Sequence, residues 1–230
     1  MRIEHPVDCA DAVALRHGIE NSMYLAGCTD ALRLNGSASG DSVLIDISGI
    51  VPKDIFIKDG KLFIGAGATL EDLASCSLVP RFIRESALFC SSLQHRNAAT
   101  VGGNIALRRL DSYLIPSLFA ADAGLTVMCT KGEKHKGIAE YYAKKGCRAM
   151  LLYVVLDEGI EGEAVRFGRT SSTHASLIAA RSGDRYCYQA SSSGLAYGDR
   201  DAYREIAFAD DIEGSAEYKR YLASVAFKEA

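Results

Sequence analysis

Residues 96–106 read RNAATVGGNIA, and this stretch is the most informative part of the chain. Two adjacent glycines, Gly102 and Gly103, follow the hydroxyl of Thr100 and precede the amide of Asn104. Adjacent glycines leave backbone N–H groups uncovered, and the two side chains add further donors within one turn. These donors suit an anionic group such as a cofactor pyrophosphate. The alternative is an ordinary glycine turn between two buried elements, and this is the favoured interpretation of the stretch taken alone.

The composition describes an ordinary globular protein of 230 residues, with 48% hydrophobic and 24% charged residues. This length suits one large domain or two small ones. The net charge is −3 and the chain has no basic block, which argues against nucleic acid or an anionic membrane as the main partner. No apolar run approaches the roughly 18 residues of a membrane-spanning helix. Acidic residues stand near the N-terminus, where a signal peptide is apolar. We therefore expect a cytoplasmic protein.

The cysteine pattern argues against a metal or iron–sulfur centre within this chain. The seven cysteines are widely spaced, with no CxxC and no Cys/His cluster: Cys9, Cys28, Cys76, Cys90, Cys129, Cys147 and Cys187. We expect reduced thiols in or near the core.

A second candidate turn, AGCTD at residues 26–30, follows a short apolar segment. Gly27 gives the backbone freedom, Thr29 offers a hydroxyl, and Asp30 is placed to cap a helix in the segment that follows. A strand-to-helix turn with Gly and Thr occurs in many folds, so a purely structural role is the favoured interpretation of this turn taken alone. Residues 34–42 are rich in Gly and Ser and predict a loop.

The periodicity of the remaining chain predicts a mixed α and β domain followed by a second unit. Asp8 is expected to cap a helix over 8–18. Asp59-Gly60 is expected to form a hairpin turn, and Thr69 with Asp72 a capping box. Further predicted elements are strands at 43–47, 55–58, 61–65, 125–130 and 150–156, and helices at 83–93, from 116 and from 138. After the acidic stretch 158–163 we expect three antiparallel strands at 165–167, 175–179 and 186–190, a loop at 191–194, and a final helix capped by Ser215.

Taken together, these motifs resemble the FAD-binding subunit of the molybdenum hydroxylases, the group of xanthine dehydrogenase and the medium subunit of aerobic carbon monoxide dehydrogenase. The family's usual forms are AGGTD, IGA-x-T-T-x-x-(E/D)-L and R-N-x-A-T-(I/V)-G-G-N-(I/L). They correspond here, in order, to Ala26–Asp30, Ile64–Leu73 and Arg96–Ile105. The closing GSAEYKRYLASVA is similar to the family's last helix. The resemblance therefore covers most of the chain, and its third motif is specific.

The resemblance implies an α+β fold: a two-lobed FAD-binding domain of the vanillyl-alcohol-oxidase and CO-dehydrogenase flavoprotein type, plus a small, shortened C-terminal α+β domain with a three-stranded antiparallel sheet and a helix. The expected FAD-binding domain is 1–157, with lobes of about 1–50 and 51–157, and the C-terminal domain is 158–230. FAD is expected between the lobes, with its pyrophosphate across the two glycine motifs.

By match to the motifs, the resemblance implies a cofactor site of thirteen residues: Leu25, Ala26, Gly27, Cys28, Thr29, Asp30, Ala99, Thr100, Gly102, Gly103, Asn104, Asp111 and Leu152. No acid–base residue is expected, because the flavin itself accepts and releases electrons. In this family a larger subunit carries a molybdenum cofactor, and a small subunit carries [2Fe–2S] clusters. Electrons pass through them to FAD and on to NAD or another acceptor, so both subunits are expected partners.

Four departures from the family pattern leave alternatives open. Cys28 replaces the second glycine of AGGTD, where a side chain disfavours positive φ; a redox-active thiol is the less favoured interpretation. His95 is either a packing residue, which is favoured, or tunes a flavin. Arg108 and Arg109 are either a solvated pair, which is favoured, or contacts to a phosphate or an acidic partner. The C-terminal unit is shorter than the family's usual one. Two rival functions stay open: a non-catalytic assembly or regulatory module with weak or no FAD, and a stand-alone flavin oxidoreductase.

Overall fold

The computed structural model describes residues 2–30, 42–144 and 148–228. The helix predicted after Asp30, nearly all of the loop predicted at 34–42, and Cys147 lie outside the described residues.

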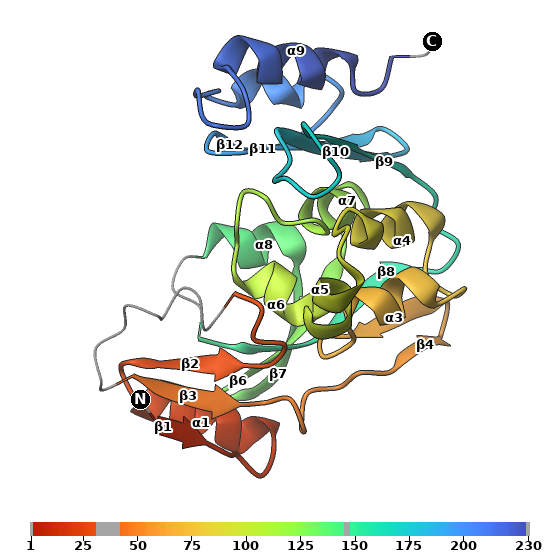
Figure 1. The fold of residues 1–230 in the computed structure, drawn as a ribbon. Coiled ribbons are helices and arrows are strands. Elements are labelled where there is room, and N and C mark those ends of the chain that lie inside the picture. The colour runs from red at the N-terminus through yellow and green to blue at the C-terminus, as the bar shows by residue number, and fades with distance from the viewer. Residues whose placement is uncertain (1, 31–41, 145–147, 229–230) are drawn as a thin grey trace.

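The chain begins with a small parallel sheet (Figure 1). Its strands occur in the order β1 (Arg2–Glu4), β3 (Val43–Asp46) and β2 (Ser22–Leu25). Helix α1 (Cys9–Gly18) connects β1 to β2. The Asp8 side chain begins this helix by accepting from the amide of Asp11 at 2.8 Å, as the sequence predicts.

A five-stranded antiparallel sheet forms the centre of the molecule. Its strands occur in the order β4 (Ile55–Lys58), β5 (Lys61–Gly65), β8 (Met150–Asp157), β6 (Gly124–Cys129) and β7 (Gly132–Gly137). The hairpin predicted at Asp59-Gly60 is confirmed, and both residues have positive φ. Strand β7 was not predicted, because it is an exposed edge strand of sequence GEKHKG and carries no apolar signal.

Short helices cover one part of this sheet: α3 (Leu70–Ser75), α4 (Arg81–Leu88), α5 (Leu93–Ala98), α6 (Val101–Ala106), α7 (Ile115–Ala120) and α8 (Ile138–Ala143). The capping box at Thr69 and Asp72 is confirmed, with distances of 3.0 and 2.8 Å. The single helix predicted at 83–93 is wrong. Helix α4 ends at Leu88, and Ser92 begins α5 by accepting from the amide of His95 at 3.3 Å.

The stretch RNAATVGGNIA is not a glycine turn. Thr100 is the N-cap of α6, and its hydroxyl accepts from the amide of Gly103 at 3.1 Å. Both glycines therefore lie in the first turn of a helix. The cap and the packing of this helix outweigh the poor helix propensity of two glycines.

The last part of the chain forms an antiparallel sheet of four strands, where three were predicted. The order is β12 (Gly194–Gly198), β11 (Arg185–Ala190), β10 (Leu177–Ser182) and β9 (Glu163–Phe167). The additional strand, β12, follows the predicted loop, and its sequence GLAYG is too short and glycine-rich to show alternation. The 3₁₀ helix η1 (Ala202–Glu205) and helix α9 (Ala216–Val225) complete the fold, and Ser215 caps α9 as predicted.

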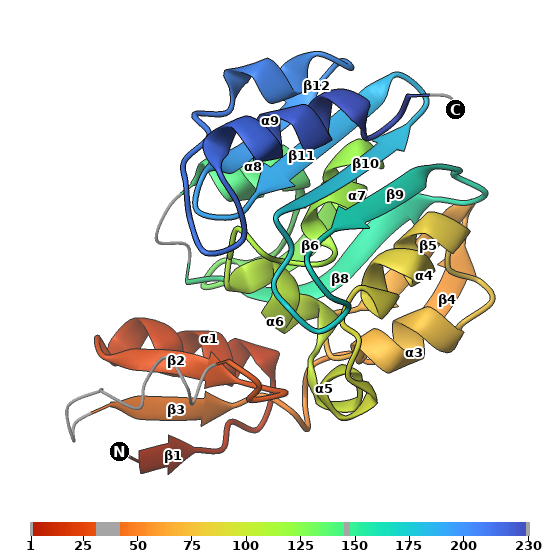
Figure 2. The same ribbon diagram turned by 45° about the horizontal axis from the view of Figure 1, so that its top comes forward.

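The C-terminal sheet is buried on both faces, which attaches it firmly to the rest of the molecule. Figures 1 and 2 show α7 under one face and α9 over the other. On β11, the buried Cys187 belongs to the main core, and its neighbour Tyr188 belongs to a second core under α9. The fully buried Lys219 of α9 donates to Asp211 at 2.8 Å and to the carbonyls of Ser191 and Ala209. The burial of α7 on all sides explains why its sequence, IPSLFA, has no polar face.

Candidate functional site

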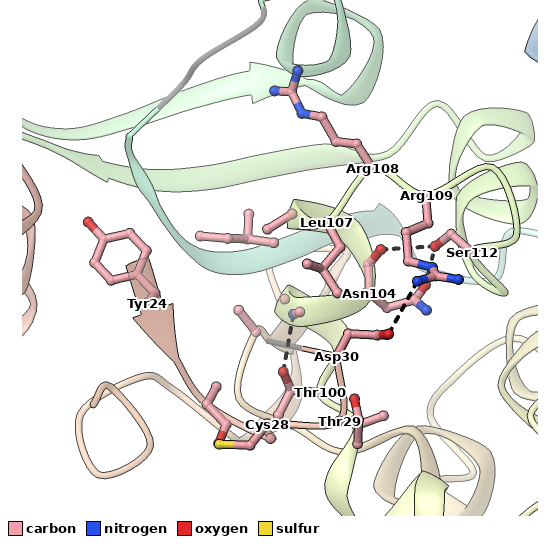
Figure 3. Close-up of a pocket in the computed structure, with 18 of the residues that line it drawn as sticks. Tyr24, Cys28, Thr29, Asp30, Thr100, Asn104, Leu107, Arg108, Arg109 and Ser112 are labelled. Carbon is pink, nitrogen blue, oxygen red and sulfur yellow. Dashed lines mark hydrogen bonds and ion pairs between the residues drawn. The ribbon is translucent and has the colours of Figure 1, made fainter. Parts of the chain in front are cut away.

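A cavity of about 860 Å³ opens between the N-terminal sheet, helices α5 and α6, and the first residues of β8 (Figure 3). This volume lies within the range of roughly 300–1,000 Å³ that small-molecule sites occupy. Both glycine motifs line it, together with the segment 106–113 and His174 from the segment between β9 and β10.

Gly27 brings the loop 26–30 against the junction of α5 and α6. A Cβ atom at this residue would lie 1.8 Å from the carbonyl oxygen of Ala98, far inside any possible contact. Only glycine allows this approach. The loop 26–30 and the start of α6 therefore meet along one wall of the cavity.

The loop 26–30 offers unused backbone donors to the cavity. Among the described residues, no acceptor binds the amides of Gly27, Cys28 or Thr29. These three consecutive residues line the cavity and are only half-buried. Consecutive uncovered amides in a turn with one left-handed residue form a concave anion-binding surface.

Helix α6 does not offer such donors, which corrects the expectation for its glycines. The amides of Val101 and Gly102 donate to the carbonyls of Ala68 and Ala66 at 2.9 and 2.7 Å. Those of Gly103 and Asn104 donate to the side chain and the carbonyl of Thr100. The four amides are therefore used within the protein.

The two glycines of α6 have different surroundings. A Cβ atom on Gly102 would lie 2.9 Å from both the Cβ and the oxygen of Ala66, so this glycine permits close packing of α6. A Cβ atom on Gly103 would meet only the Thr100 hydroxyl, at 3.0 Å, and would otherwise stand in open space. Because Gly103 lines the cavity, that open space is the cavity.

Asn104 is the side-chain donor that α6 presents to the cavity. Its Oδ1 accepts from the Ser112 hydroxyl at 2.6 Å and from the amide of Leu114 at 3.2 Å (Figure 3). Both bonds fix the orientation of the amide group. Its Nδ2 forms no hydrogen bond with any described residue. The side chain is thus anchored at its acceptor and keeps its two donor hydrogens for a ligand.

Four titratable side chains form an ion-pair cluster beside these donors: Asp30, Arg109, Asp111 and His174. The Arg109 guanidinium forks onto Asp111, with 2.7 Å from Nε to Oδ1 and 2.6 Å from Nη2 to Oδ2. Its Nη1 reaches Asp30 at 3.2 Å. Burial alone would raise the pKa of Asp111, but Arg109 and His174 hold that pKa below its ordinary value. The hydrogen bond to Asp111 in turn raises the pKa of Arg109.

Arg108 also has fixed partners, so the expectation of a solvated arginine pair is wrong. Arg108 has a left-handed backbone, with φ of 51°. Its guanidinium donates to the carbonyls of Tyr141 and Tyr142 at 2.7 and 3.3 Å, and it stacks 4.8 Å from the centre of the Tyr141 ring. Arg108 therefore holds the end of α8 against the cavity wall.

Cys28 adopts the backbone conformation that favours glycine, with φ of 59°. Its thiol donates to the carbonyl of Ala26 at 3.2 Å. Burial and, second, the charge of Asp46 raise the pKa of this thiol. A raised pKa lowers the thiolate fraction and argues against a reactive cysteine.

Most of the sequence-predicted site residues line the cavity, but Leu25 and Leu152 do not. Leu152 is buried in the core, and its carbonyl accepts from the amide of Ala66 at 2.8 Å. The preceding residue, Leu151, lines the cavity instead. His95 is exposed at the cavity, so its expected packing role is wrong.

Sequence reasoning missed several lining residues for lack of a signal. In the run MLLYVVL every residue is apolar, so the pattern does not show that Leu151, not Leu152, faces the cavity. Arg16, Arg148 and His174 stand in no motif, and only the fold brings them to the cavity.

The described residues contain no group of three or more His, Cys, Asp or Glu side chains that could hold a metal ion. Across the same residues, no helix is both long enough and apolar enough to cross a membrane.

Comparison with known proteins gives a consistent result. Residues 1–155 match the family model of the FAD binding domain in molybdopterin dehydrogenase. The uncharacterized protein YgfM of Escherichia coli is 30% identical over 186 residues, which are 73% of this chain and 70% of YgfM.

Among solved structures, a chain of carbon monoxide dehydrogenase from Hydrogenophaga pseudoflava aligns with a TM-score of 0.85 and 19% identity, covering 97% of this chain and 93% of that one. A chain of quinoline 2-oxidoreductase from Pseudomonas putida 86 aligns with a TM-score of 0.84 and 16% identity, covering 98% and 93%. At these identities the two structures establish the fold, and they extend the likeness into the C-terminal unit.

Proposed function

Because this chain belongs to the family of FAD-binding domains in molybdopterin dehydrogenases, we propose that it is the electron-transfer flavoprotein subunit of a molybdenum hydroxylase. In this proposal it takes electrons from [2Fe–2S] clusters of a small partner subunit, which receive them from a molybdenum-containing large subunit. It passes them through FAD to NAD or another acceptor. The proposed FAD-binding domain is 1–157, and the C-terminal unit is 158–230.

The observation that carries this proposal is the pairing of unused donors in one cavity. Three amides of the loop 26–30 and the Nδ2 group of Asn104 have no acceptor among the described residues. A pyrophosphate is a dianion, and charge-assisted hydrogen bonds to it are stronger than bonds between neutral groups. The donor set therefore suits the pyrophosphate of FAD.

The rest of the cavity suits the flat rings of the cofactor. Buried and half-buried apolar side chains line it beside the donors: Ile47, Val51, Leu70, Leu107, Met150 and Leu151. We propose that these side chains pack against FAD, and that the following residues surround it: Ala26, Gly27, Cys28, Thr29, Asp30, Ala99, Thr100, Gly102, Gly103, Asn104 and Asp111. We do not include Leu25 or Leu152, because neither lines the cavity.

Bound FAD supplies the redox chemistry, since its ring accepts and releases electrons. The protein residues bind the cofactor, orient it and limit its contact with water. No side chain needs to act as an acid or base for this task. The six described cysteines are free thiols, which favours a reducing compartment, and we keep the cytoplasm as the proposed location.

The first test is FAD binding by the purified full chain, measured as flavin absorbance and as FAD released on denaturation. Asn104→Asp is the matched variant, because it keeps an oxygen acceptor for Ser112 and Leu114 but replaces the donor with a second oxygen. We expect wild-type protein to be yellow, and Asn104→Asp to fold but bind FAD at least tenfold more weakly (about 1.5–3 kcal/mol for a hydrogen bond to a charged group).

A colourless wild-type protein that takes up no added FAD would contradict the proposal and favour an assembly or regulatory module. Steady oxidation of an organic substrate by the isolated chain would instead favour a stand-alone flavin oxidoreductase. Transfer of electrons is tested with the copurified partner subunits, by reduction of the flavin when the hydroxylase substrate is added.

A further inference from the structure

The ion-pair cluster joins three segments that are distant in the sequence. Asp30 ends the loop 26–30, Arg109 and Asp111 belong to the segment between α6 and α7, and His174 comes from the C-terminal unit (Figure 3 shows Asp30 and Arg109). All four residues line the cavity. The cluster therefore holds together the parts that surround the proposed FAD site.

Arg109 is the centre of this cluster, and its geometry requires an arginine. Its Nε and Nη2 are used by the fork onto Asp111, which leaves Nη1 to reach Asp30 at 3.2 Å. The planar guanidinium makes these contacts in two directions at once, which the single ammonium of a lysine does not reproduce. With 27% of its side chain exposed, Arg109 is shielded enough for the geometry to be fixed.

Asp30 directly follows the three residues whose amides are free. The loop 26–30 also contains Cys28 in a left-handed conformation, which costs free energy unless the surrounding structure holds it. The ion pair to Arg109 ties the end of this loop to the segment after α6.

The charge of Arg109 matters as much as its position. Without it, the carboxylates of Asp30 and Asp111 would lose the cation that they share at the cavity. Both would then repel the pyrophosphate dianion. Arg109 compensates part of this negative charge while three of its five N–H groups bind the two carboxylates.

The C-terminal unit holds the same segment at two points. The His174 Nδ1 lies 2.7 Å from Asp111. The buried Gln189 of β11 donates from Nε2 to the carbonyl of Ser112 at 3.0 Å, and Ser112 in turn anchors Asn104. Both donor groups of the site are therefore connected to the C-terminal unit through residues 109–112.

We propose that Arg109 is a positioning residue for FAD, which acts through Asp30 to hold the phosphate-facing amides of the loop 26–30, and that the C-terminal unit supports it through Asp111. This proposal rests on the proposed FAD-binding function. It assigns to Arg109 no direct contact with the cofactor. The C-terminal unit is then part of the FAD site.

The test compares the full-length Arg109→Gln variant with wild type in its binding of FAD and of riboflavin, which lacks both phosphates. Arg185→Gln is the matched control, because Arg185 also pairs with an aspartate of the preceding domain, Asp122 at 2.9 Å, but outside the cavity. We expect Arg109→Gln to lose at least about tenfold in FAD affinity and less than about threefold in riboflavin affinity. Arg185→Gln should retain both.

A second comparison tests whether Arg109 acts through Asp30. In an Asp30→Ala background, Arg109→Gln should weaken FAD binding by a smaller factor than in wild type, because the two residues are coupled. Arg109→Lys should recover only part of the lost affinity.

Unchanged FAD affinity in Arg109→Gln would overturn the inference while leaving the FAD-binding function intact, since wild type still binds. Equal losses for FAD and riboflavin would also overturn it, because they would indicate a general structural defect. Failure of wild type to bind FAD would contradict the proposed function itself.

Discussion

Replacing Gly103 by alanine should separate folding from cofactor binding. Gly103 lies in the first turn of α6, and the added Cβ would meet only the Thr100 hydroxyl, at 3.0 Å. That contact requires a small shift of one side chain. Alanine also gains about 0.5–1 kcal/mol over glycine within a helix. We therefore expect the stability of the apoprotein to stay within about 1 kcal/mol of wild type, a change in Tm of no more than roughly 4 °C.

The same methyl group should harm FAD binding, because it enters the cavity. Overpacking a filled site costs about 1–3 kcal/mol. This corresponds to a roughly 5- to 150-fold loss of FAD affinity, since about 1.4 kcal/mol is a factor of ten. Gly103→Val adds two more methyl groups and should abolish binding.

The matched control is Gly102→Ala, one residue earlier in the same helix. Its Cβ would lie 2.9 Å from two atoms of Ala66, so this variant should lose stability by about 1–3 kcal/mol. Differential scanning fluorimetry of the apoproteins and fluorescence titration with FAD measure the two effects. Wild-type FAD affinity in Gly103→Ala would refute the placement of FAD against α6. Equal destabilisation by both variants would refute the distinction between the two glycines.

Three further predictions address other parts of the site and the fold. Cys28→Gly should relieve a left-handed backbone conformation that costs about 1–2 kcal/mol, and the greater chain entropy of glycine in the unfolded state should offset part of this gain. Tm should therefore not fall, and FAD affinity should be retained. A clear loss of FAD affinity in the titration would instead assign a binding role to the thiol. Leu152→Ala should lower the free energy of unfolding by about 2–5 kcal/mol without a specific loss of FAD affinity, whereas Leu151→Ala should weaken FAD binding. Denaturant unfolding and FAD titration measure the two effects, and a loss of FAD affinity in Leu152→Ala but not in Leu151→Ala would contradict this assignment. Burial would raise the pKa of Asp211, but Lys219 and Ser191 hold this pKa well below the usual range. The ionised Asp211 therefore contributes its full stabilisation above the unfolded pKa of about 3.9, and this stabilisation is lost as pH falls below that value. Asp211→Asn should show a shallower loss of Tm than wild type in that acid range, and identical pH profiles of Tm would contradict this.

The elements that the sequence predicts correctly are those whose signal is local. Asp8, Thr69 and Ser215 each accept from an amide three residues ahead, and Asp59-Gly60 forms its turn from its own backbone preferences. These interactions depend on neighbours in the chain, so a sequence pattern contains them. The edge strand β7 and the short strand β12 depend instead on pairing with distant strands, and no local pattern indicated them.

The same distinction explains the partial success at the candidate site. The motifs identified both glycine-containing segments, because their residue types are unusual. They did not show that Arg109 reaches Asp30, 79 residues away, or that Asp111 meets His174 of the C-terminal unit. The run MLLYVVL is apolar throughout, so its pattern could not show which leucine faces the cavity.

The structure also changes which motif carries the argument for an anionic ligand. The second half of the specific motif, RNAATVGGNIA, forms helix α6, whose first four amides are used within the protein. Its glycines allow close packing and leave space for a ligand, and the Asn104 side chain has a donor group that no described residue uses. The amides that find no acceptor in the described part of the chain belong to the less specific motif, AGCTD. A relative that keeps the GGN sequence but loses the loop 26–30 would therefore keep the shape of this cavity and lose most of its donors. The GGN motif alone therefore does not establish FAD binding.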